Sequence, residues 1–150
     1  MTLGRISKTD AADAATRRRL LAVWESSVRA THDFLTEEDI LALRPEVENG
    51  IKYIERLYCF YDENNVIQGF IGVVADKIEM LFVDALSRGC GIGKALVDQA
   101  INVLDVKYVD VNEQNPQGIG FYEKAGFKTF SRSDLDAQSK PFPILHMKIF

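Results

Sequence analysis

The sequence predicts a mixed α/β fold of about seven strands and about four helices, and three observations support it. Short β-rich runs bounded by turn residues recur along the chain. Apolar residues fall at helical spacing in other segments, as at Leu20, Trp24 and Val28. A turn with three glycines, at residues 89–93, leads directly into an apolar-periodic helix. With 150 residues, of which 47% are hydrophobic, the chain is expected to fold as one domain over residues 1–150.

Capping residues predict the first two helices. Asp10 is the expected N-cap of a helix that fades near residues 29–33. Thr36 and Asp39 have the spacing of a capping box, and they predict the start of a second helix. Proline restricts the residue before it and lacks a backbone N–H, so the Arg44-Pro45 pair is expected to interrupt this helix.

The strands are predicted from β-branched and aromatic residues between turn signals. Residues 62–65 supply turn chemistry between two such runs and predict an antiparallel hairpin over 57–75. One later helix follows the glycine turn to about Leu104, and Pro116 opens another over residues 116–126. The other expected strands are residues 3–7, 78–84, 107–112, 127–133 and 143–150.

Charge and cysteine content limit the classes of partner. The chain has 18 basic and 22 acidic residues and a net charge of −4, which argues against general attraction to nucleic acid or acidic membranes. Cys59 and Cys90 have neither metal-ligand spacing nor the number expected of a disulfide framework. The N-terminus lacks the apolar core of a signal peptide. We therefore expect a cytoplasmic protein that binds neither nucleic acid nor membrane.

The glycine turn predicts a phosphate site. Gly89, Gly91 and Gly93 allow close approach to backbone N–H groups, and the helix start adds partial positive charge. A P-loop would need glycine at position 88 and serine or threonine at position 95, where arginine and alanine stand. The dinucleotide fingerprint fails in both possible registers. The pattern Arg-x-x-Gly-x-Gly fits completely, starting at Arg88.

Two segments carry a resemblance to a known family. The run RGCGIGKAL is followed about 20 residues later by VNEQNPQGIGFYEKAGF. Together they resemble the GNAT superfamily of acetyl-CoA-dependent N-acetyltransferases, and the element order agrees. The specific likeness lies between Glu79 and Phe127. It implies a central mixed, mostly antiparallel sheet of about seven strands flanked by about four helices.

The resemblance also implies the sites. In the family, the strand before the glycine turn lends backbone groups to the pantetheine arm, and the turn binds the pyrophosphate. The implied cofactor-binding residues are Phe82, Val83, Arg88, Gly89, Cys90, Gly91, Ile92, Gly93, Lys94, Asn115 and Tyr122. The first two helices border the acceptor, so the candidate substrate-binding residues are Trp24, Thr31, His32 and Phe34. Cys90 stands where a basic residue is frequent, and Gly118 replaces a usual alanine.

Acetyl transfer requires a neutral amine, a stabilised oxyanion and protonation of the departing thiolate. The Val83 N–H is expected to hold the oxyanion, and Tyr122 suits the last step because a phenol stays protonated at neutral pH. Glu79 is the first candidate for the base, since burial on a central strand would raise its pKa. The alternative for Glu79 is a strand-end carboxylate exposed to solvent. His32 is the second candidate, beside a helix-boundary role, and ordered water is the third. His146 is interpreted as a surface or edge histidine.

The predicted function is direct acetyl transfer from acetyl-CoA to a primary amine of a small molecule or protein, without metal or acyl-enzyme. One alternative is an acyl-CoA-binding sensor module that does not turn over. Another is a nucleotide-binding protein that uses the same loop. Sequence alone does not choose the amine acceptor, nor decide between a monomer and a homodimer.

Overall fold

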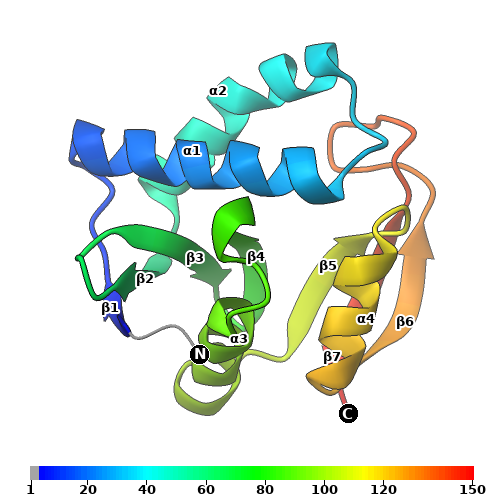
Figure 1. Ribbon diagram of the computed structural model, residues 1–150. Helices are drawn as coiled ribbons and strands as arrows, with labels where there is room; N and C mark the ends of the chain where they lie inside the picture. Colours follow the sequence, from blue (N-terminus) through cyan, green and yellow to red (C-terminus); the bar gives the residue numbers. More distant parts are fainter. Residues whose placement is uncertain (1–3) are drawn as a thin grey trace.

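The computed structural model describes residues 4–150, and residue 3, the expected start of the first strand, lies outside this range. Every strand and helix expected from the sequence is present within it, in the expected order (Figure 1). The elements are β1 (Gly4–Lys8), α1 (Ala14–Thr31), α2 (Glu37–Tyr53), β2 (Arg56–Asp62), β3 (Ile67–Val74), β4 (Lys77–Val83), a 3-10 helix (Ala85–Ser87), α3 (Ile92–Val103), β5 (Tyr108–Asn112), α4 (Pro116–Lys124), β6 (Phe127–Ser133) and β7 (Ile144–Ile149).

The seven strands form one sheet in the order β1-β2-β3-β4-β5-β7-β6. All neighbours are antiparallel except β4 and β5, so the mixed, mostly antiparallel sheet is confirmed. The parallel pair is joined at only two positions, Lys77 with Tyr108 and Ile78 with Val109. Beyond them β4 and β5 diverge, and Figure 1 shows the opening in the middle of the sheet.

The helices cover the sheet unequally. Leu20, Trp24 and Val28 of α1 are buried, and with α2 they pack on the face of β2 and β3 that carries Cys59 and Phe70. Helices α3 and α4 pack on the opposite face, against a core that runs from β2 to β6. On the first face, α1 and α2 lie over the β1–β4 half, and the β5-β7-β6 half has no helix of its own among residues 4–150 (Figure 1).

Two expectations for the first helices are wrong. The N-cap of α1 is Asp13, whose carboxylate accepts from the Thr16 N–H at 2.9 Å, while Asp10 caps a turn by accepting from the Ala12 N–H. Helix α2 runs through Pro45 without interruption. Pro45 is exposed, so the backbone bond that it removes lies on the solvent side of the helix. None of the helices in residues 4–150 has the length and apolar character needed to cross a membrane.

Local capping fixes the other boundaries. The Thr36–Asp39 capping box is confirmed, with both reciprocal hydrogen bonds formed. In the hairpin, the Asp62 carboxylate accepts from the N–H groups of Asn64 and Val66. Asn65 adopts a positive φ of 63°, a conformation that asparagine tolerates in turns.

Candidate active site

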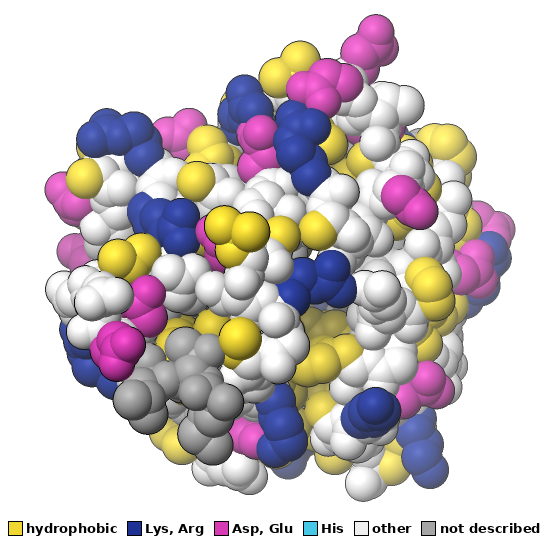
Figure 2. All heavy atoms as spheres, viewed as in Figure 1, with side chains coloured by type: hydrophobic (Ala, Val, Ile, Leu, Met, Phe, Trp, Pro, Cys, Tyr) yellow, Lys and Arg dark blue, Asp and Glu magenta, His cyan; other side chains and the backbone are white. Residues whose placement is uncertain are grey.

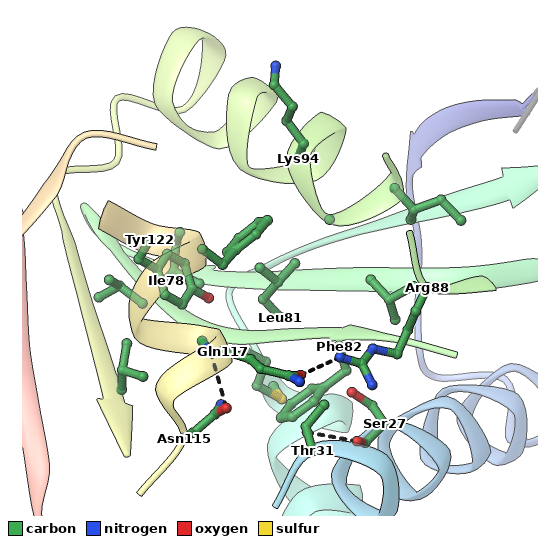
Figure 3. Close-up of a pocket in the computed structure, with 18 of the residues that line it drawn as sticks. Ser27, Thr31, Ile78, Leu81, Phe82, Arg88, Lys94, Asn115, Gln117 and Tyr122 are labelled. Carbon is green, nitrogen blue, oxygen red and sulfur yellow. Dashed lines mark hydrogen bonds between the residues drawn. The ribbon is translucent and has the colours of Figure 1, made fainter. Parts of the chain in front are cut away.

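A cavity of about 530 Å³ lies where β4 and β5 diverge. Its walls come from these two strands, the glycine turn, the start of α3, α4 and the end of α1 (Figure 3). Figure 2 shows the opening as a hollow floored by hydrophobic side chains between α3 and α4, with basic side chains on its rim. An apolar floor beneath a basic rim suits an extended ligand with a charged end.

The glycine turn meets the conformational demand expected of it. Gly89 and Gly91 have φ values of 77° and 82°, a region that side chains other than glycine rarely adopt. A Cβ at either position would meet nothing within 4 Å, so the space beside them is open. Gly91 is the N-cap of the 12-residue helix α3. The first N–H groups of α3 therefore lack side-chain caps and can receive an anion.

The two basic residues of the turn, Arg88 and Lys94, direct their side chains differently with respect to the cavity. Arg88 lies beside the cavity and donates a hydrogen bond to the Gln117 side chain of α4 (Figure 3). Lys94 points away from the cavity in this view and pairs with Asp98 at 2.8 Å. Cys90 is half-buried and its thiol donates to the Arg88 carbonyl at 3.8 Å. Arg88 is thus the basic residue of the turn that already faces the cavity.

The backbone of β4 is open toward the cavity at alternate residues. The Asp84 N–H donates to β3 at 2.8 Å, and Phe82 faces Phe70 of β3 in the same register. Because antiparallel ladders alternate, the N–H groups of Leu81 and Val83 point instead toward the gap beside β5. Phe82 therefore contributes its ring, which packs 5.7 Å from that of Phe70, rather than its backbone.

Tyr122 lies inside the cavity wall on α4. It is 8% exposed, its ring packs edge-on against Phe121 and Phe127, and no residue of 4–150 hydrogen bonds its hydroxyl. Burial raises the pKa of this phenol, so it remains protonated well above neutral pH. Asn115 is the N-cap of α4, and its side-chain oxygen accepts from the Gly118 N–H at 3.1 Å. This cap fixes the start of the helix that holds Tyr122.

Glu79 does not have the surroundings expected of a buried base. The register of β3 against β4 shifts after Gly72, and Glu79 is the extra residue of the resulting β-bulge. Its side chain is 41% exposed, and its carboxylate lies 3.8 Å from the Lys77 ammonium. The expected burial is therefore wrong, although Glu79 still lines the cavity.

A second cavity, of about 470 Å³, lies on the other side of the same opening. Trp24 and Phe34, both expected near the acceptor, line it, whereas Thr31 lines the first cavity. Phe34 stacks on Phe142 of the β6–β7 loop at 5.8 Å, which closes one side. The residues common to both cavities are His32, Phe82, Asp110 and Asn112.

His32 has the helix-boundary position considered for it, and it also lines both cavities. Its backbone N–H caps the C-terminus of α1 by donating to the Val28 carbonyl, and its ring lies between the two cavities. Burial lowers the pKa of the imidazole and favours its neutral form. The Thr31 hydroxyl donates to the Ser27 carbonyl, so its oxygen accepts from His32 Nδ1–H. Nε2 is then the acceptor nitrogen of this ring.

Of the two positions expected for His146, the edge is wrong, whereas its side chain is partly exposed, at 28%. β7 lies between β5 and β6, so His146 has a strand on each side. Its Nδ1 is 2.7 Å from Asp110 Oδ1, and its Nε2 is 2.7 Å from Ser133 Oγ. All three residues line the second cavity. Sequence reasoning missed this cluster because its members come together only through the strand order.

Gly69 is a further residue that the sequence analysis missed. A Cβ at this position would lie 2.9 Å from Ile92 Cγ2 and 3.2 Å from the Phe82 carbonyl. Glycine here lets the start of α3 rest directly on β3, which sets the position of the glycine turn. A glycine inside a strand pattern is the signal that predicts such a close approach.

The fold and these cavities define an acyltransferase of the GNAT class, and the comparisons with known proteins agree. The GNAT acetyltransferase domain matches residues 54–129. The chain is 38% identical over 131 residues to the peptidyl-lysine N-acetyltransferase YjaB of Escherichia coli K12, covering 85% of this chain and 86% of that protein. It is 37% identical over 129 residues to YjaB of Salmonella typhimurium, covering 86% and 88% of the two chains. The chain belongs to the GNAT family and is an acetyl-CoA-dependent N-acetyltransferase.

Solved structures support the same assignment. The apo form of Escherichia coli YjaB superposes with a TM-score of 0.88 at 34% identity, covering 97% of each chain. The PaiA N-acetyltransferase of Thermoplasma acidophilum, solved with coenzyme A, has a TM-score of 0.71 at 21% identity, covering 98% of this chain and 99% of that one. The second likeness concerns the fold alone. The family predicted from the glycine turn and the FYEKAGF segment is confirmed, and the nucleotide-binding alternative is excluded.

Proposed function

We propose that this enzyme transfers acetyl from acetyl-CoA directly to the side-chain amine of lysine residues in proteins. One observation carries the proposal: the two cavities are adjacent and share four lining residues, His32, Phe82, Asp110 and Asn112. A donor in the first cavity and an amine in the second would meet there without an acyl-enzyme intermediate. The two YjaB relatives, named peptidyl-lysine N-acetyltransferases, supply the acceptor class.

The composition of the second cavity suits a lysine side chain. Trp24, Phe34 and Phe142 belong to a largely apolar wall. Apart from the two histidines, its ionisable lining residues are the acids Asp110 and Asp136. A lysine has an apolar four-carbon stem that ends in a cation, so both parts of it find complementary surroundings.

The donor end of the proposal rests on the glycine turn and β4. The N–H groups at the start of α3, with Arg88, would hold the pyrophosphate of acetyl-CoA. The open backbone groups of Leu81 would bind the pantetheine arm, and the Val83 N–H would donate to the developing oxyanion. Lys94 reaches phosphate only by leaving Asp98, which is easily done because its side chain is 77% exposed.

Tyr122 is the proposed general acid. Its buried hydroxyl is free of hydrogen bonds to other described residues and faces the cavity in Figure 3. It would donate a hydrogen bond to the charge that develops on the departing thiolate. Full proton transfer is uphill, because the thiol pKa of about 8.5 lies below that of a phenol, so the hydrogen bond supplies the main stabilisation. Glu79 and His32 are both considered as proton acceptors for the amine. Glu79 would act from an exposed position, through water, whereas Nε2 of His32 lies between the two cavities.

We further propose that the enzyme works in the cytoplasm as one catalytic domain, either monomeric or as a homodimer. Burial raises the pKa of the Cys59 thiol to about 11, which keeps it in the inert thiol form. Cys90 sits at the turn as a free thiol. A reducing compartment suits both.

The acceptor class is tested with synthetic peptides and acetyl-CoA, using mass spectrometry to locate the acetyl group. A lysine peptide with a blocked N-terminus is compared with a lysine-free peptide whose N-terminus is free, and with a polyamine. We expect acetylation of the lysine side chain to be much faster than the other two reactions. Preference for the free N-terminus or the polyamine, with lysine unmodified, would contradict the proposal.

A further inference from the structure

We propose that Ser133, His146 and Asp110 form the chain that takes up the proton of the acceptor amine, with His146 as the residue that holds it. The inference rests on the proposed function, because it concerns the amine in the second cavity. It assigns the base to a group other than Glu79 or His32. Two features of the structure carry it: the hydrogen-bond geometry of the three residues and their position in the second cavity.

The hydrogen bonds fix the protonation pattern of the ring. An ionised carboxylate only accepts, so Asp110 Oδ1, 2.7 Å from Nδ1, places the imidazole proton on Nδ1. Nε2 then carries a lone pair and accepts from the Ser133 hydroxyl at 2.7 Å. A carboxylate, an imidazole and a hydroxyl in this order form the arrangement by which enzymes draw a proton from a bound group.

The position of the chain is the second argument. The chain spans three adjacent strands: Asp110 is on β5, His146 on β7 and Ser133 on β6. All three side chains line the second cavity, over the half of the sheet that α1 and α2 leave uncovered. Asp110 lines both cavities, whereas Ser133 lines the second one alone. His146 is 28% exposed on its side chain, so a proton that it holds can pass to solvent.

The proton balance is simple. An acceptor ammonium donates to Ser133 Oγ, and as its N–H bond breaks, Oγ gains that proton. The hydroxyl proton that Oγ already carries passes to Nε2, so the amine becomes neutral and His146 becomes imidazolium. Asp110 stabilises this cation and keeps its own negative charge. No oxidant, metal or covalent intermediate is needed.

The charges around the ring act in opposite directions, because Asp110 stabilises an imidazolium whereas the Lys77 ammonium opposes it. Lys77 binds the second Asp110 oxygen at 2.6 Å; burial opposes its charge, but the hydrogen bond and charge of Asp110 outweigh this and raise the pKa of Lys77. Lys148 stacks 5.1 Å from the Phe130 ring, which separates it from His146. Across the cavity stand His32 on α1 and Asp136 on the β6–β7 loop.

The test compares kcat/KM for a lysine peptide across the pH range in the wild type, His146→Gln and Ser133→Ala. At pH 7 both variants should be about 10²-fold slower, the usual contribution of a positioned base. The deficit should shrink above pH 9, because the neutral fraction of an amine with a pKa of about 10.4 rises tenfold per pH unit. Added imidazole should partly restore His146→Ala.

Lys148→Gln is the matched control, since it removes a cation from the same strand and the same face but lines neither cavity. It should keep the wild-type pH profile. A thermal shift with acetyl-CoA, unchanged in all variants, would show that the donor site is intact.

The outcomes separate the two proposals. If the wild type acetylates no lysine peptide, the proposed function fails before any variant is made. If the wild type is active and either His146→Gln or Ser133→Ala keeps its rate and profile, the proton chain is overturned while the proposed function stands. A uniform loss at every pH, with a lower Tm and no rescue by imidazole, would mean that the cluster only joins three strands, and this too overturns the inference.

Discussion

A Cβ at position 118 would lie 2.5 Å from Nδ2 of Asn115, so Gly118 and the Asn115 side chain fit only because the former is glycine. Glycine in a helix interior costs about 1 kcal/mol relative to alanine. At position 118 the glycine also leaves room for the N-cap of α4: its N–H donates a hydrogen bond to the Asn115 side chain. The glycine that departs from the family pattern is thus matched to its own N-cap.

This fit predicts opposite effects for two glycines of α4. Gly118→Ala should destabilise the protein by about 1 kcal/mol, because displacement of the Asn115 cap outweighs the gain in helix propensity. Gly120→Ala should stabilise it by up to about 1 kcal/mol, since a Cβ there meets nothing within 4 Å. Urea unfolding of both variants measures the difference. Equal stabilisation by both would show that the cap adjusts freely.

Tyr122→Phe should remove activity and little else. The ring contacts with Phe121 and Phe127 remain, so Tm and acetyl-CoA affinity should change little. Loss of the proton donor should lower the single-turnover rate by about 10²- to 10⁴-fold. Because burial raises the pKa of Tyr122, the wild type should also show no loss of rate from its ionisation below about pH 10. A Phe variant as fast as the wild type would remove Tyr122 from the chemistry.

Gly91→Glu should abolish acetyl-CoA binding, since it adds a side chain and a negative charge beside the N-terminus of α3. Gly126→Glu is the matched control: Gly126 also has positive φ, 105°, and open space, but it lines neither cavity. Both variants place a side chain at a positive φ and are therefore strained, but only the first should lose the thermal shift with acetyl-CoA. If both variants lose the thermal shift, the loss in Gly91→Glu comes from a folding defect and not from the cofactor site.

His32 predicts a pH dependence of stability. Burial lowers its pKa in the folded state, so between that value and about 6.5 the unfolded chain binds more protons. The titration of His32 should therefore leave the free energy of unfolding unchanged above about pH 6.5. As the pH is lowered from there toward 5, the free energy of unfolding should decrease. His32→Gln should show a smaller decrease over this window. Carboxylates such as Glu25, whose pKa its partner Arg44 lowers, lose their contribution only at more acidic pH.

The element order could be predicted because its signals are local. The Thr36–Asp39 capping box and the turn at residues 62–65 each depend on neighbours within four positions. The expected N-cap Asp10 is wrong by three residues because helix boundaries are only weakly marked by local sequence, and Asp13 is an equally acceptable capping residue. The interruption expected at Pro45 is wrong for a related reason. Pro45 lies on the exposed side of the helix, and its sequence neighbours do not show this.

The cofactor loop was predictable for the same reason as the elements, but the acid–base groups were not. Alternation along a strand assigned Glu79 to a buried face, yet the bulge opposite Gly72 arises from how β3 pairs with β4. Alternation with Ile144 and Lys148 in the last strand favours a surface or edge position for His146, whereas the sheet inserts that strand between β5 and β6. Both errors concern pairing between distant segments, which no local pattern records.

The two-position junction between β4 and β5 creates strand edges in the middle of the sheet. Unpaired strand edges at the periphery of a protein invite pairing with another chain and hence aggregation. Here α1, α3 and α4 wall the opening, and the unpaired amides of β4 are recessed behind them. The fold thus keeps backbone hydrogen-bonding groups available to a narrow ligand while shielding them from neighbouring molecules.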